Sequence, residues 1–400
     1  MPIFKKRAPR ALARHGRLKV QSRASAFGGI LVKALAMIAG ASVAIAGVAI
    51  WELSSTIQGN GIDLPNSKTL TAADLKGPIN MLLVGSDTRK GQGKGYGNES
   101  STLADVMILL HVSADRKNAV AVSFPRDLMV PWPACPSTSG GPGYLEQSLG
   151  QLNATIANGG PGCTLLTIEK LTGLTIPYLA MIDFKGVIEL SNAIGGVDDW
   201  VANEINDPYT QTYLQPGKYT LQGKAALQFL RTRHGVGDGS DLSRISNQQV
   251  FLTSLVRKIK SNGVLTNPVQ LYSLANAAAR NMKLSQSLTD LNTMVSLAGA
   301  LRNVELDKMV FLQVPSRGGL PAPYSGRVMP IYEQANVLFA KLVNDEPIEL
   351  SGSNTGQGAV VATPSPTPTS KSTASPTPTP TPTDGLNLIG TNAATTTCSN

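Results

Sequence analysis

The sequence predicts an α/β protein: a single extracytoplasmic domain with a central mixed β-sheet flanked by helices, preceded by one transmembrane helix. Three observations support this prediction. A long apolar run follows a basic N-terminal segment, short aliphatic runs alternate with amphipathic segments over about 270 residues, and the composition changes abruptly after residue 350. The predicted parts are a basic cytoplasmic stub (1–26), a transmembrane helix (27–51), a linker (52–79), the α/β domain (80–349) and a disordered tail rich in Thr, Pro and Ser (350–400).

The N-terminal segment combines positive charge with an uninterrupted apolar stretch. Residues 1–51 carry nine of the 35 basic residues and no acidic residue, and residues 34–51 contain no charge. Since a bilayer core about 30 Å thick needs roughly 20 apolar residues, the length fits one spanning helix. The positive flank predicts a cytoplasmic N-terminus and an extracytoplasmic remainder at the cell membrane. A cleaved signal peptide is the alternative, because the small residues between 41 and 49 resemble a cleavage site.

The net charge of +9 comes entirely from this segment. After residue 51, 26 basic and 26 acidic residues remain, so the rest of the chain is formally neutral. A protein that coats nucleic acid with a basic surface is therefore not expected.

Strands and helices of the domain are predicted from periodicity. Short aliphatic runs bounded by turn residues indicate strands, and apolar residues three to four positions apart indicate helices. The predicted strands are 80–84, 106–112, 119–124, 181–184 and 309–314, and the predicted helices are 186–193, 221–230, 245–259, 268–281, 287–301 and 332–343.

The three cysteines fit an oxidising compartment. Cys135 and Cys163 enclose a stretch rich in Gly, Pro and Ser. A disulfide between them would stabilise the fold by about 3 kcal/mol. A zinc site is the weaker alternative, because no histidine lies near either residue. Cys398 has no evident partner, so it is either free or part of an intermolecular disulfide.

The segment 362–383 consists almost entirely of Thr, Ser and Pro. It lacks the apolar mass that would offset the entropy of ordering, so we expect an extended, polyproline-like chain. Outside a membrane, such a segment is either O-glycosylated or threaded through a cell wall, or it is an unmodified spacer.

Acidic residues and arginines recur at the ends of the predicted strands. Asp87 follows the first strand, Asp105 precedes the second, and Arg126 follows the third. In an open α/β sheet the carboxyl ends of the strands form the binding crevice. Carboxylates bind Mg²⁺ and guanidinium groups bind phosphate oxygens, so the pattern predicts a site for a Mg²⁺-bound pyrophosphate. Four further candidates for this site follow later in the chain: Arg231, Arg233, Arg244 and Gln248.

Each candidate also has an ordinary structural explanation. Asp87 could cap a turn, and Arg126 could form a strand-end ion pair with Asp127. The motifs of serine hydrolases and zinc metalloproteases, G-x-S-x-G and H-E-x-x-H, are absent. For the later arginines the alternatives are a solvated edge (Arg231, Arg233) and a surface bridge to Asp241 (Arg244).

Taken in order, these segments resemble the LytR-CpsA-Psr family of membrane-anchored enzymes that attach glycopolymers to bacterial cell walls. The resemblance covers residues 80–260. It rests on five ordered blocks: LLVGSDTR (82–89), ADVMIL (104–109), SFPRD (123–127), IGGVD (194–198) and GKAALQFLRTR (223–233).

The resemblance implies a phosphotransferase of cell wall biogenesis. Such an enzyme moves a sugar phosphate from a polyprenyl-pyrophosphate carrier to a muramyl hydroxyl of peptidoglycan, which creates a phosphodiester. The implied partners are the lipid-linked glycan, peptidoglycan and the membrane, and no nucleic acid. The disulfide is typical of actinobacterial members. The implied glycopolymer is arabinogalactan for such a member, or a teichoic acid.

The resemblance also assigns roles to residues. Asp87 and Asp105 would hold Mg²⁺, for which Mn²⁺ could substitute, and both would act in catalysis together with Arg126. One position departs from the family pattern, because Asn247 stands where an arginine is common. The implied pyrophosphate ligands are Arg89, Arg231, Arg233, Arg244 and Gln248.

Two other functions use the same features. A polyprenyl-pyrophosphate-sugar pyrophosphatase would need the same residues, with water as the nucleophile. A non-catalytic wall-tethering or regulatory protein would need only the N-terminal anchor and the tail.

The predicted helix 245–259 either walls a lipid tunnel or packs in the core.

Overall fold

The computed structural model describes residues 23–65, 76–87, 103–137, 141–261, 267–350, 355–356, 358–362, 386 and 388–400. The contacts within the chain divide it into two units, residues 1–52 and residues 53–400. The larger unit contains the described β-sheets and the candidate site.

The N-terminal unit is helical where it is described. The helix α1 (Arg23–Gly59) includes the predicted helix 27–51 and continues beyond it. Among the described residues, no helix is both long and apolar enough to cross a membrane. Residues 1–22, which make up most of the predicted stub, and the side chains of residues 23–36 lie outside the described residues. The membrane anchor stays a prediction.

The linker predicted over 52–79 is wrong for its first part. The last turns of α1 bury Leu53 and Ile57, which lie one helical turn apart and pack against the sheet. The chain then forms strand β1 (Gly61–Ile62), which pairs in parallel with β12 (Met282–Ser285). The domain therefore begins at Leu53 and not at residue 80. Residues 66–75 lie outside the described residues.

The predicted central mixed sheet is confirmed. Among the described residues it has eight strands in the order β1-β12-β7-β2-β3-β4-β13-β17, the last of which is Gly390–Asn392. The strand β3 runs antiparallel to both β2 and β4, whereas β7 is parallel to β2 and β13 is parallel to β4. The five predicted strands correspond to β2 (Ile79–Ser86), β3 (Ala104–Val112), β4 (Ala119–Phe124), β7 (Tyr178–Ile182) and β13 (Met309–Gln313).

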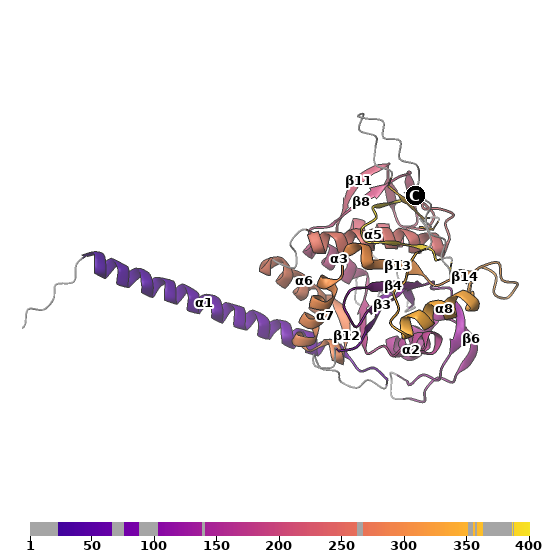
Figure 1. The fold of residues 1–400 in the computed structure, drawn as a ribbon, viewed down its shortest axis with the longest axis horizontal. Coiled ribbons are helices and arrows are strands. Elements are labelled where there is room, and N and C mark those ends of the chain that lie inside the picture. Colours follow the sequence, from indigo (N-terminus) through magenta and orange to yellow (C-terminus); the bar gives the residue numbers. More distant parts are fainter. Residues whose placement is uncertain are drawn as a thin grey trace, which may run out of the picture. The chain divides into compact units, whose positions relative to one another are not determined.

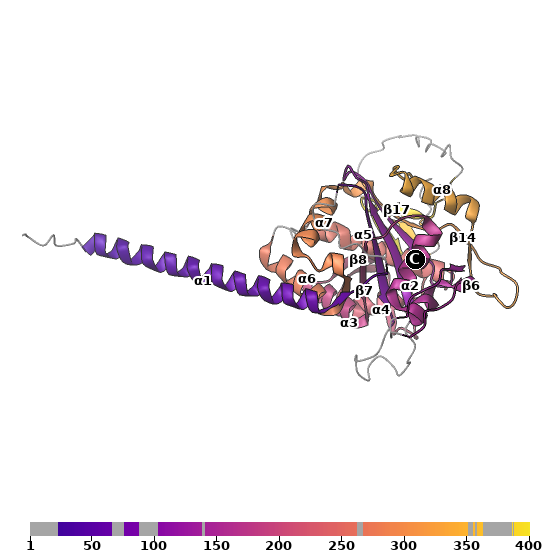
Figure 2. The ribbon, with the colours of Figure 1, turned by 90° about the horizontal axis from the view of Figure 1, so that it is seen from below.

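Helices cover both faces of this sheet (Figures 1 and 2). Alternate residues of β4 enter different cores: Val120 and Val122 pack with α2 and α8, and Ala119 and Ala121 pack with the end of α1 and with α7. Burial on both faces explains why β4 reads as a continuous aliphatic run. The bounds are α2 (Thr155–Thr172), α3 (Phe184–Ala193), α5 (Asp241–Ser261), α6 (Pro268–Asn281), α7 (Leu291–Asn303) and α8 (Tyr332–Val343).

A second sheet, which the sequence did not predict, packs against α5. Its strand order is β11-β8-β18-β16, and its apolar side chains form a separate core with α4 (Lys224–Arg231) and Phe251 of α5. The helix predicted to begin at 221 begins at Lys224, because Leu221 belongs to β11. The strands here are β8 (Val197–Val201), β11 (Gly217–Leu221) and the separate hairpin of β9 (Ile205–Asp207) and β10 (Thr212–Leu214).

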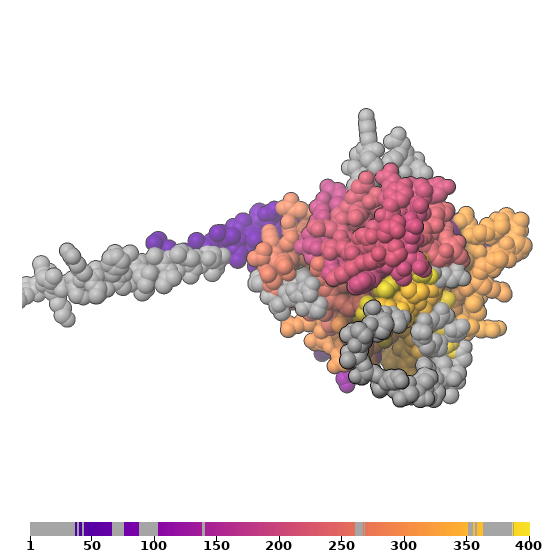
Figure 3. All heavy atoms as spheres, turned by 90° about the horizontal axis from the view of Figure 1, so that it is seen from above, coloured from indigo at the N-terminus to yellow at the C-terminus, as the bar shows by residue number. Residues whose placement is uncertain are grey.

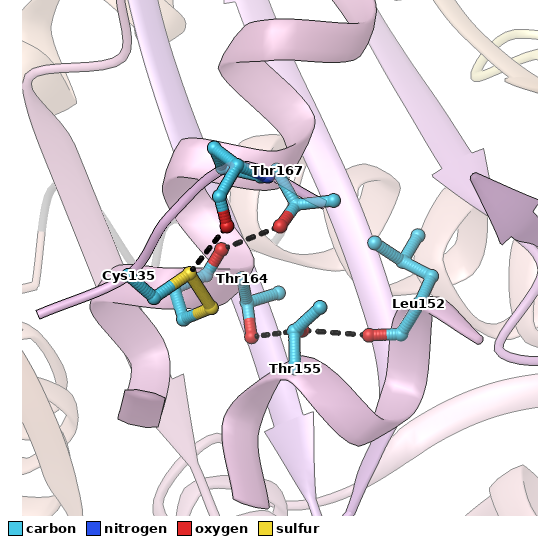
Figure 4. Close-up of a disulfide and its surroundings, with 7 residues drawn as sticks. Cys135, Leu152, Thr155, Thr164 and Thr167 are labelled. Carbon is cyan, nitrogen blue, oxygen red and sulfur yellow. Dashed lines mark hydrogen bonds between the residues drawn. A yellow bond between two sulfur atoms is a disulfide. The ribbon is translucent and has the colours of Figure 1, made fainter. Parts of the chain in front are cut away.

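The predicted disulfide is present between Cys135 and Cys163, which are 28 residues apart (Figure 4). It joins the loop after β5 to helix α2. A side chain at Gly159 would put a Cβ atom 2.7 Å from that of Cys163, so glycine lets the two segments approach. The other short elements are β5 (Met129–Trp132), β6 (Gln147–Gln151), η3 (Leu152–Ala154), η4 (Gln286–Leu288), η5 (Leu306–Lys308), β14 (Ser316–Arg317) and β15 (Met329–Pro330).

The prediction of a disordered tail over 350–400 is wrong for its ends. β16 (Ala359–Val361) and β18 (Thr397–Ser399) pair with each other, and β18 also pairs with β8. β17 (Gly390–Asn392) extends the central sheet beside β13. These strands satisfy the backbone groups of exposed sheet edges. Figure 3 shows the C-terminal residues, in yellow, against the pink surface of the second sheet.

The Thr/Pro-rich segment is consequently a connection between two anchored strands and not a free tail. Residues 363–385 lie outside the described residues, but β16 before them and β17 after them belong to the folded domain. Cys398 is a free, buried thiol in β18, and this burial removes the exposure that an intermolecular disulfide would need.

A buried carboxylate lies between the second sheet and α5. Asp199 of β8 is 1% exposed, and its Oδ1 accepts hydrogen bonds from Ser254 Oγ (3.2 Å) and Trp200 N (3.1 Å). Its Oδ2 has no hydrogen-bond partner within the described part of the chain. Burial raises the pKa of Asp199 to about 7, although these hydrogen bonds and Arg257 oppose the shift.

Deleting residues 386–400 should lower the free energy of unfolding by at least about 3 kcal/mol, because Leu386 and Leu388 are buried and β17 and β18 would be lost. Chemical denaturation measures this difference. As a control, deleting residues 370–379 from the Thr/Pro-rich connection should change the stability by less than about 1 kcal/mol, because loop length has a small entropic effect. Equal stability of the wild type and the C-terminal deletion would contradict the described role of these strands.

The Asp199→Asn variant should alter the pH dependence of stability. The folded-state pKa of about 7 lies above the unfolded value of roughly 3.9, so the folded protein binds more protons between these limits. The stability that Asp199 contributes is therefore present at pH 4 and lost as the pH rises toward 7. We expect the unfolding temperature of the wild type, relative to Asp199→Asn, to fall from pH 5 to pH 8. Parallel curves for the two proteins would contradict this account.

Candidate active site

The candidate residues meet at one edge of the central sheet. The carboxyl ends of β2, β4, β7 and β13 lie at this edge, together with the amino end of the antiparallel strand β3. Asp87 follows β2, Asp105 begins β3, and Arg126 follows β4. The chain direction of these strands thus brings the predicted residues together, as expected for an α/β sheet.

A β-bulge sets the position of Asp105. Gly85 pairs with Val106 and Ser86 pairs with Ala104, so Asp105 is the extra residue on β3. Bulges often occur next to active sites, where they redirect a side chain. Here the side chain of Asp105 reaches Arg126, whose Nη1 lies 2.7 Å from Asp105 Oδ1.

The centre of the site is a network of alternating charges. Arg126 lies 3.6 Å from Asp241 Oδ1 and 3.5 Å from Asp127 Oδ2, measured from its Nε. Arg244 Nη2 lies 2.6 Å from Asp241 Oδ1 and donates to the main-chain oxygen of Asp105 at 2.9 Å. The Arg244–Asp241 pair is buried, with side chains 5% and 7% exposed, so it is not the surface bridge considered from sequence.

Unused donors remain in this network. Within the described residues, the Nε atoms of Arg126, Arg233 and Arg244 are buried and have no hydrogen-bond partner. Burial lowers the pKa of Arg244 despite the nearby carboxylates, and the positive charges of Arg126 and Arg233 lower it further. Burial also opposes the charge of Arg126, but Asp105, Asp241 and Asp127 raise its pKa on balance. Buried N–H groups and crowded positive charges favour an anionic ligand.

An apolar cavity of about 250 Å³ adjoins the charged residues. It lies between the sheet and helices α3, α4 and α5, and its lining includes Asp105, Arg231 and Arg244. Arg231 also lies over the ring of Phe184, with Cζ 4.4 Å from the ring centroid. The apolar lining comprises Leu83, Val84, Val106, Ile108, Ala180, Ile182, Phe184, Val187, Leu190, Leu227, Leu230, Phe251, Leu252, Leu255 and Met282. Helix α5 therefore walls a cavity as well as contributing to the core.

Gln248 and Asn247 have different surroundings. Gln248 lines the cavity, and its Nε2 donates to the carbonyl oxygen of Leu230 at 3.0 Å, next to Arg231. Asn247 is fully buried, donates to the carbonyl oxygen of Phe229 at 3.0 Å and accepts a hydrogen bond from Ser399 of β18. Asn247 thus joins α4, α5 and the C-terminal strand.

The predicted metal ligands Asp87 and Asp105 each have a polar partner within the chain. Asp87 Oδ1 accepts a hydrogen bond from Leu103 N at 2.7 Å, and Asp105 Oδ1 is paired with Arg126. Among the described residues, no three His, Cys, Asp or Glu side chains converge as a metal site. Mg²⁺ is often held by one or two carboxylates together with substrate phosphates, and the Mg²⁺ site stays a prediction.

Three contacts of the site were not predicted from sequence. Asp127 Oδ1 lies 2.7 Å from Arg327 Nη1 and accepts from Gln151 Nε2 at 2.6 Å. The main chain of the Arg126 loop is also held, because Asn153 N donates to the oxygen of Arg126 at 3.1 Å. Arg327 lies 200 residues from Asp127, and no sequence pattern links them. The predicted ligand Arg89 lies outside the described residues.

Comparisons with known proteins agree on one family. The sequence model of the LytR_cpsA_psr family matches residues 53–336. The cell wall biosynthesis protein LcpA of Corynebacterium glutamicum is 29% identical over 269 residues, which cover 61% of this chain and 51% of that protein. The chain thus spans about half the length of this relative.

Two further proteins are similar. The polyisoprenyl-teichoic acid–peptidoglycan teichoic acid transferase TagT of Bacillus subtilis is 28% identical over 236 residues, or 58% of this chain and 67% of that protein. The solved structure of a LytR-Csp2A-Psr enzyme from Actinomyces oris is 23% identical, with a TM-score of 0.52 over 70% of this chain and 94% of that one. This structural similarity supports the fold.

Asp241→Ala should lower the free energy of unfolding by about 3 kcal/mol, because it leaves the buried Arg244 guanidinium without its nearest carboxylate. Asp198→Ala is the matched control. It breaks an ion pair with Lys218 whose side chains are half-exposed, so it should cost no more than about 1 kcal/mol. Denaturant titrations measure both changes, and similar losses for the two variants would contradict the buried network.

Proposed function

Because this chain belongs to the LytR-CpsA-Psr family, we propose that it transfers a glycopolymer from a polyprenyl-pyrophosphate carrier to peptidoglycan. The acceptor would be a muramyl hydroxyl, and the product a phosphodiester in the cell wall. The relative TagT is named as a polyisoprenyl-teichoic acid–peptidoglycan transferase, which supports the reaction class.

One observation carries this proposal: an apolar cavity adjoins a cluster of arginines. A polyprenyl pyrophosphate has two matching parts, an aliphatic chain and a highly charged headgroup. The chain would occupy the cavity between α3 and α5, where it would be removed from water. The pyrophosphate would then lie against Arg231, Arg233 and Arg244 and use their N–H groups.

The proposed reaction is a phosphoryl transfer. The acceptor hydroxyl oxygen attacks the phosphorus that bears the sugar, and a new phosphorus–oxygen bond forms. The bond from this phosphorus to the bridging oxygen breaks, and polyprenyl phosphate leaves with the electron pair. The hydroxyl proton passes to a carboxylate, for which Asp87 and Asp105 are the candidates. Positioning and charge neutralisation provide most of the catalysis in such reactions.

We include Mg²⁺ in the proposal, with Mn²⁺ as a substitute. Asp87 and Asp105 would hold the ion together with phosphate oxygens, and the one that binds the ion less tightly would take the hydroxyl proton. When bound, the ion would neutralise charge on the pyrophosphate. Arg126 would orient Asp105 through their 2.7 Å ion pair and supply positive charge beside the transferred group.

The proposed location follows from the substrate. A polyprenyl carrier is confined to a membrane, so the predicted helix 27–51 would keep the enzyme beside it, with the domain extracytoplasmic. The glycopolymer itself is left open between arabinogalactan and a teichoic acid.

The test uses the full chain in detergent with Mg²⁺, a short-chain polyprenyl-pyrophosphate sugar and muramyl-containing peptidoglycan fragments. Mass spectrometry should detect sugar phosphate joined to muramic acid. Release of free sugar phosphate alone would indicate the pyrophosphatase instead. Tight binding of the lipid without turnover would favour the tethering function, and either result would overturn the proposal.

Arg231→Ala should lower kcat/KM by about 100-fold, because one charge-stabilising donor at the transferred phosphate is lost. Its unfolding temperature should remain close to that of the wild type, since Arg231 is only half-buried. Lys308→Ala is the control, because Lys308 precedes β13 at the opposite edge of the sheet. The transfer assay measures both variants. Wild-type turnover in Arg231→Ala would contradict its assignment.

A further inference from the structure

Two exposed rings share a buried carboxylate with Arg233 of the candidate site. Tyr209, in the turn between β9 and β10, is 81% exposed. Its ring centroid lies 4.6 Å from that of His234, with an angle of 42° between the ring planes. We call these two side chains the aromatic platform. A tyrosine left this exposed gains little from folding, so its position calls for another explanation.

A single buried carboxylate holds both sides of the platform. Asp207 Oδ1 accepts from Tyr209 N at 3.0 Å, and Asp207 Oδ2 accepts from His234 N at 3.3 Å. The same Oδ2 accepts from Thr232 Oγ1 at 2.7 Å and from Arg233 N at 2.9 Å. Burial raises the pKa of Asp207, but these hydrogen bonds lower it on balance. The Asp207 carboxylate therefore stays ionised at neutral pH. The platform is therefore fixed by its backbone.

The carboxylate of Asp207 also connects the aromatic platform to the arginine cluster. Arg233 shares Asp207 with the platform through its main-chain nitrogen, and its guanidinium charge acts on Arg244 inside the site. The buried Nε of Arg233 has no hydrogen-bond partner in the described part of the chain. A proposed pyrophosphate contact, Arg233, is therefore the immediate chain neighbour of His234 in the aromatic platform.

We propose that the aromatic platform binds a pyranose ring of the glycan that the pyrophosphate carries. One face of a pyranose ring presents C–H groups that stack on an aromatic ring, while its hydroxyls remain hydrated. Tyrosine and histidine suit such a ligand because each has an apolar face and a polar edge. The donor glycan is favoured over the acceptor, because its first sugar is bonded to the phosphate that the arginines would hold. This inference rests on the proposed function.

The experiment compares the binding of two soluble probes to the full chain by calorimetry. One probe is geranyl pyrophosphate, and the other is geranyl pyrophosphate carrying one N-acetylglucosamine. We expect Tyr209→Ala to raise the Kd of the sugar-bearing probe about tenfold and to leave the Kd of the sugar-free probe unchanged. His234→Ala should have the same selectivity. Tyr209→Phe should bind like the wild type, because it keeps the stacking face.

A control variant separates the platform from general surface effects. Tyr213→Ala removes another exposed tyrosine of the same hairpin, on β10, that is not stacked on His234. It should leave both Kd values unchanged. An equal change for the two probes, or no change in Tyr209→Ala, would overturn the proposal while leaving the proposed function intact.

The acceptor provides the remaining arm of the test. If Tyr209→Ala instead raises the KM for muramyl-containing fragments in the transfer assay and leaves the donor Kd unchanged, the platform binds the acceptor and the proposal is wrong. Failure of the wild type to bind either geranyl probe would contradict the proposed function itself, and the platform proposal with it. The two failures are therefore distinguishable.

Discussion

The carboxylate of Asp105 is the contact on which the candidate site depends. It pairs with Arg126 at 2.7 Å and lies 3.9 Å from Arg244 Nη1, so one negative charge holds two guanidinium groups. Without such a counter-charge, partly buried arginines would repel one another strongly in a medium of low dielectric. Asp241 adds a second counter-charge from the start of α5. The carboxylates thus keep the arginines in place while some of their N–H groups stay unused. A site prepared in this way needs little rearrangement when an anion binds.

Helix α5 connects this charge cluster to the apolar cavity and to the C-terminal strand β18. Gln248 and Asn247 are adjacent on α5 but serve different neighbours. Gln248 holds the carbonyl of Leu230 beside the cavity, and Asn247 holds the carbonyl of Phe229 and Ser399 of β18. The C-terminal strand therefore supports the helix that carries Arg244.

The strands and helices that were predicted correctly are those whose hydrophobic pattern is local in the sequence. The aliphatic run 119–124 has the same bounds as β4. The helices 268–281 and 332–343 also have the predicted ends, because both show clear apolar periodicity. In addition, Asn267 caps the first of these helices and Pro268 is its first residue. The strand order also explains why Asp105 and Arg126 were expected to meet. The β-bulge at Asp105, the contact between Asp127 and Arg327, and β17 (Gly-Thr-Asn) depend on partners far away in the chain. No local hydrophobic pattern indicates such pairings, so they could not be predicted.

In the proposed enzyme, one site combines an apolar cavity with a pyrophosphate-binding arginine cluster. The most direct measurement is a crystal structure of the chain with a short-chain polyprenyl pyrophosphate. We expect the aliphatic chain between the sheet and helices α3 and α5, with the pyrophosphate oxygens on Arg231, Arg233 and Arg244. A pyrophosphate bound away from these arginines, or an aliphatic chain outside the cavity, would contradict this expectation.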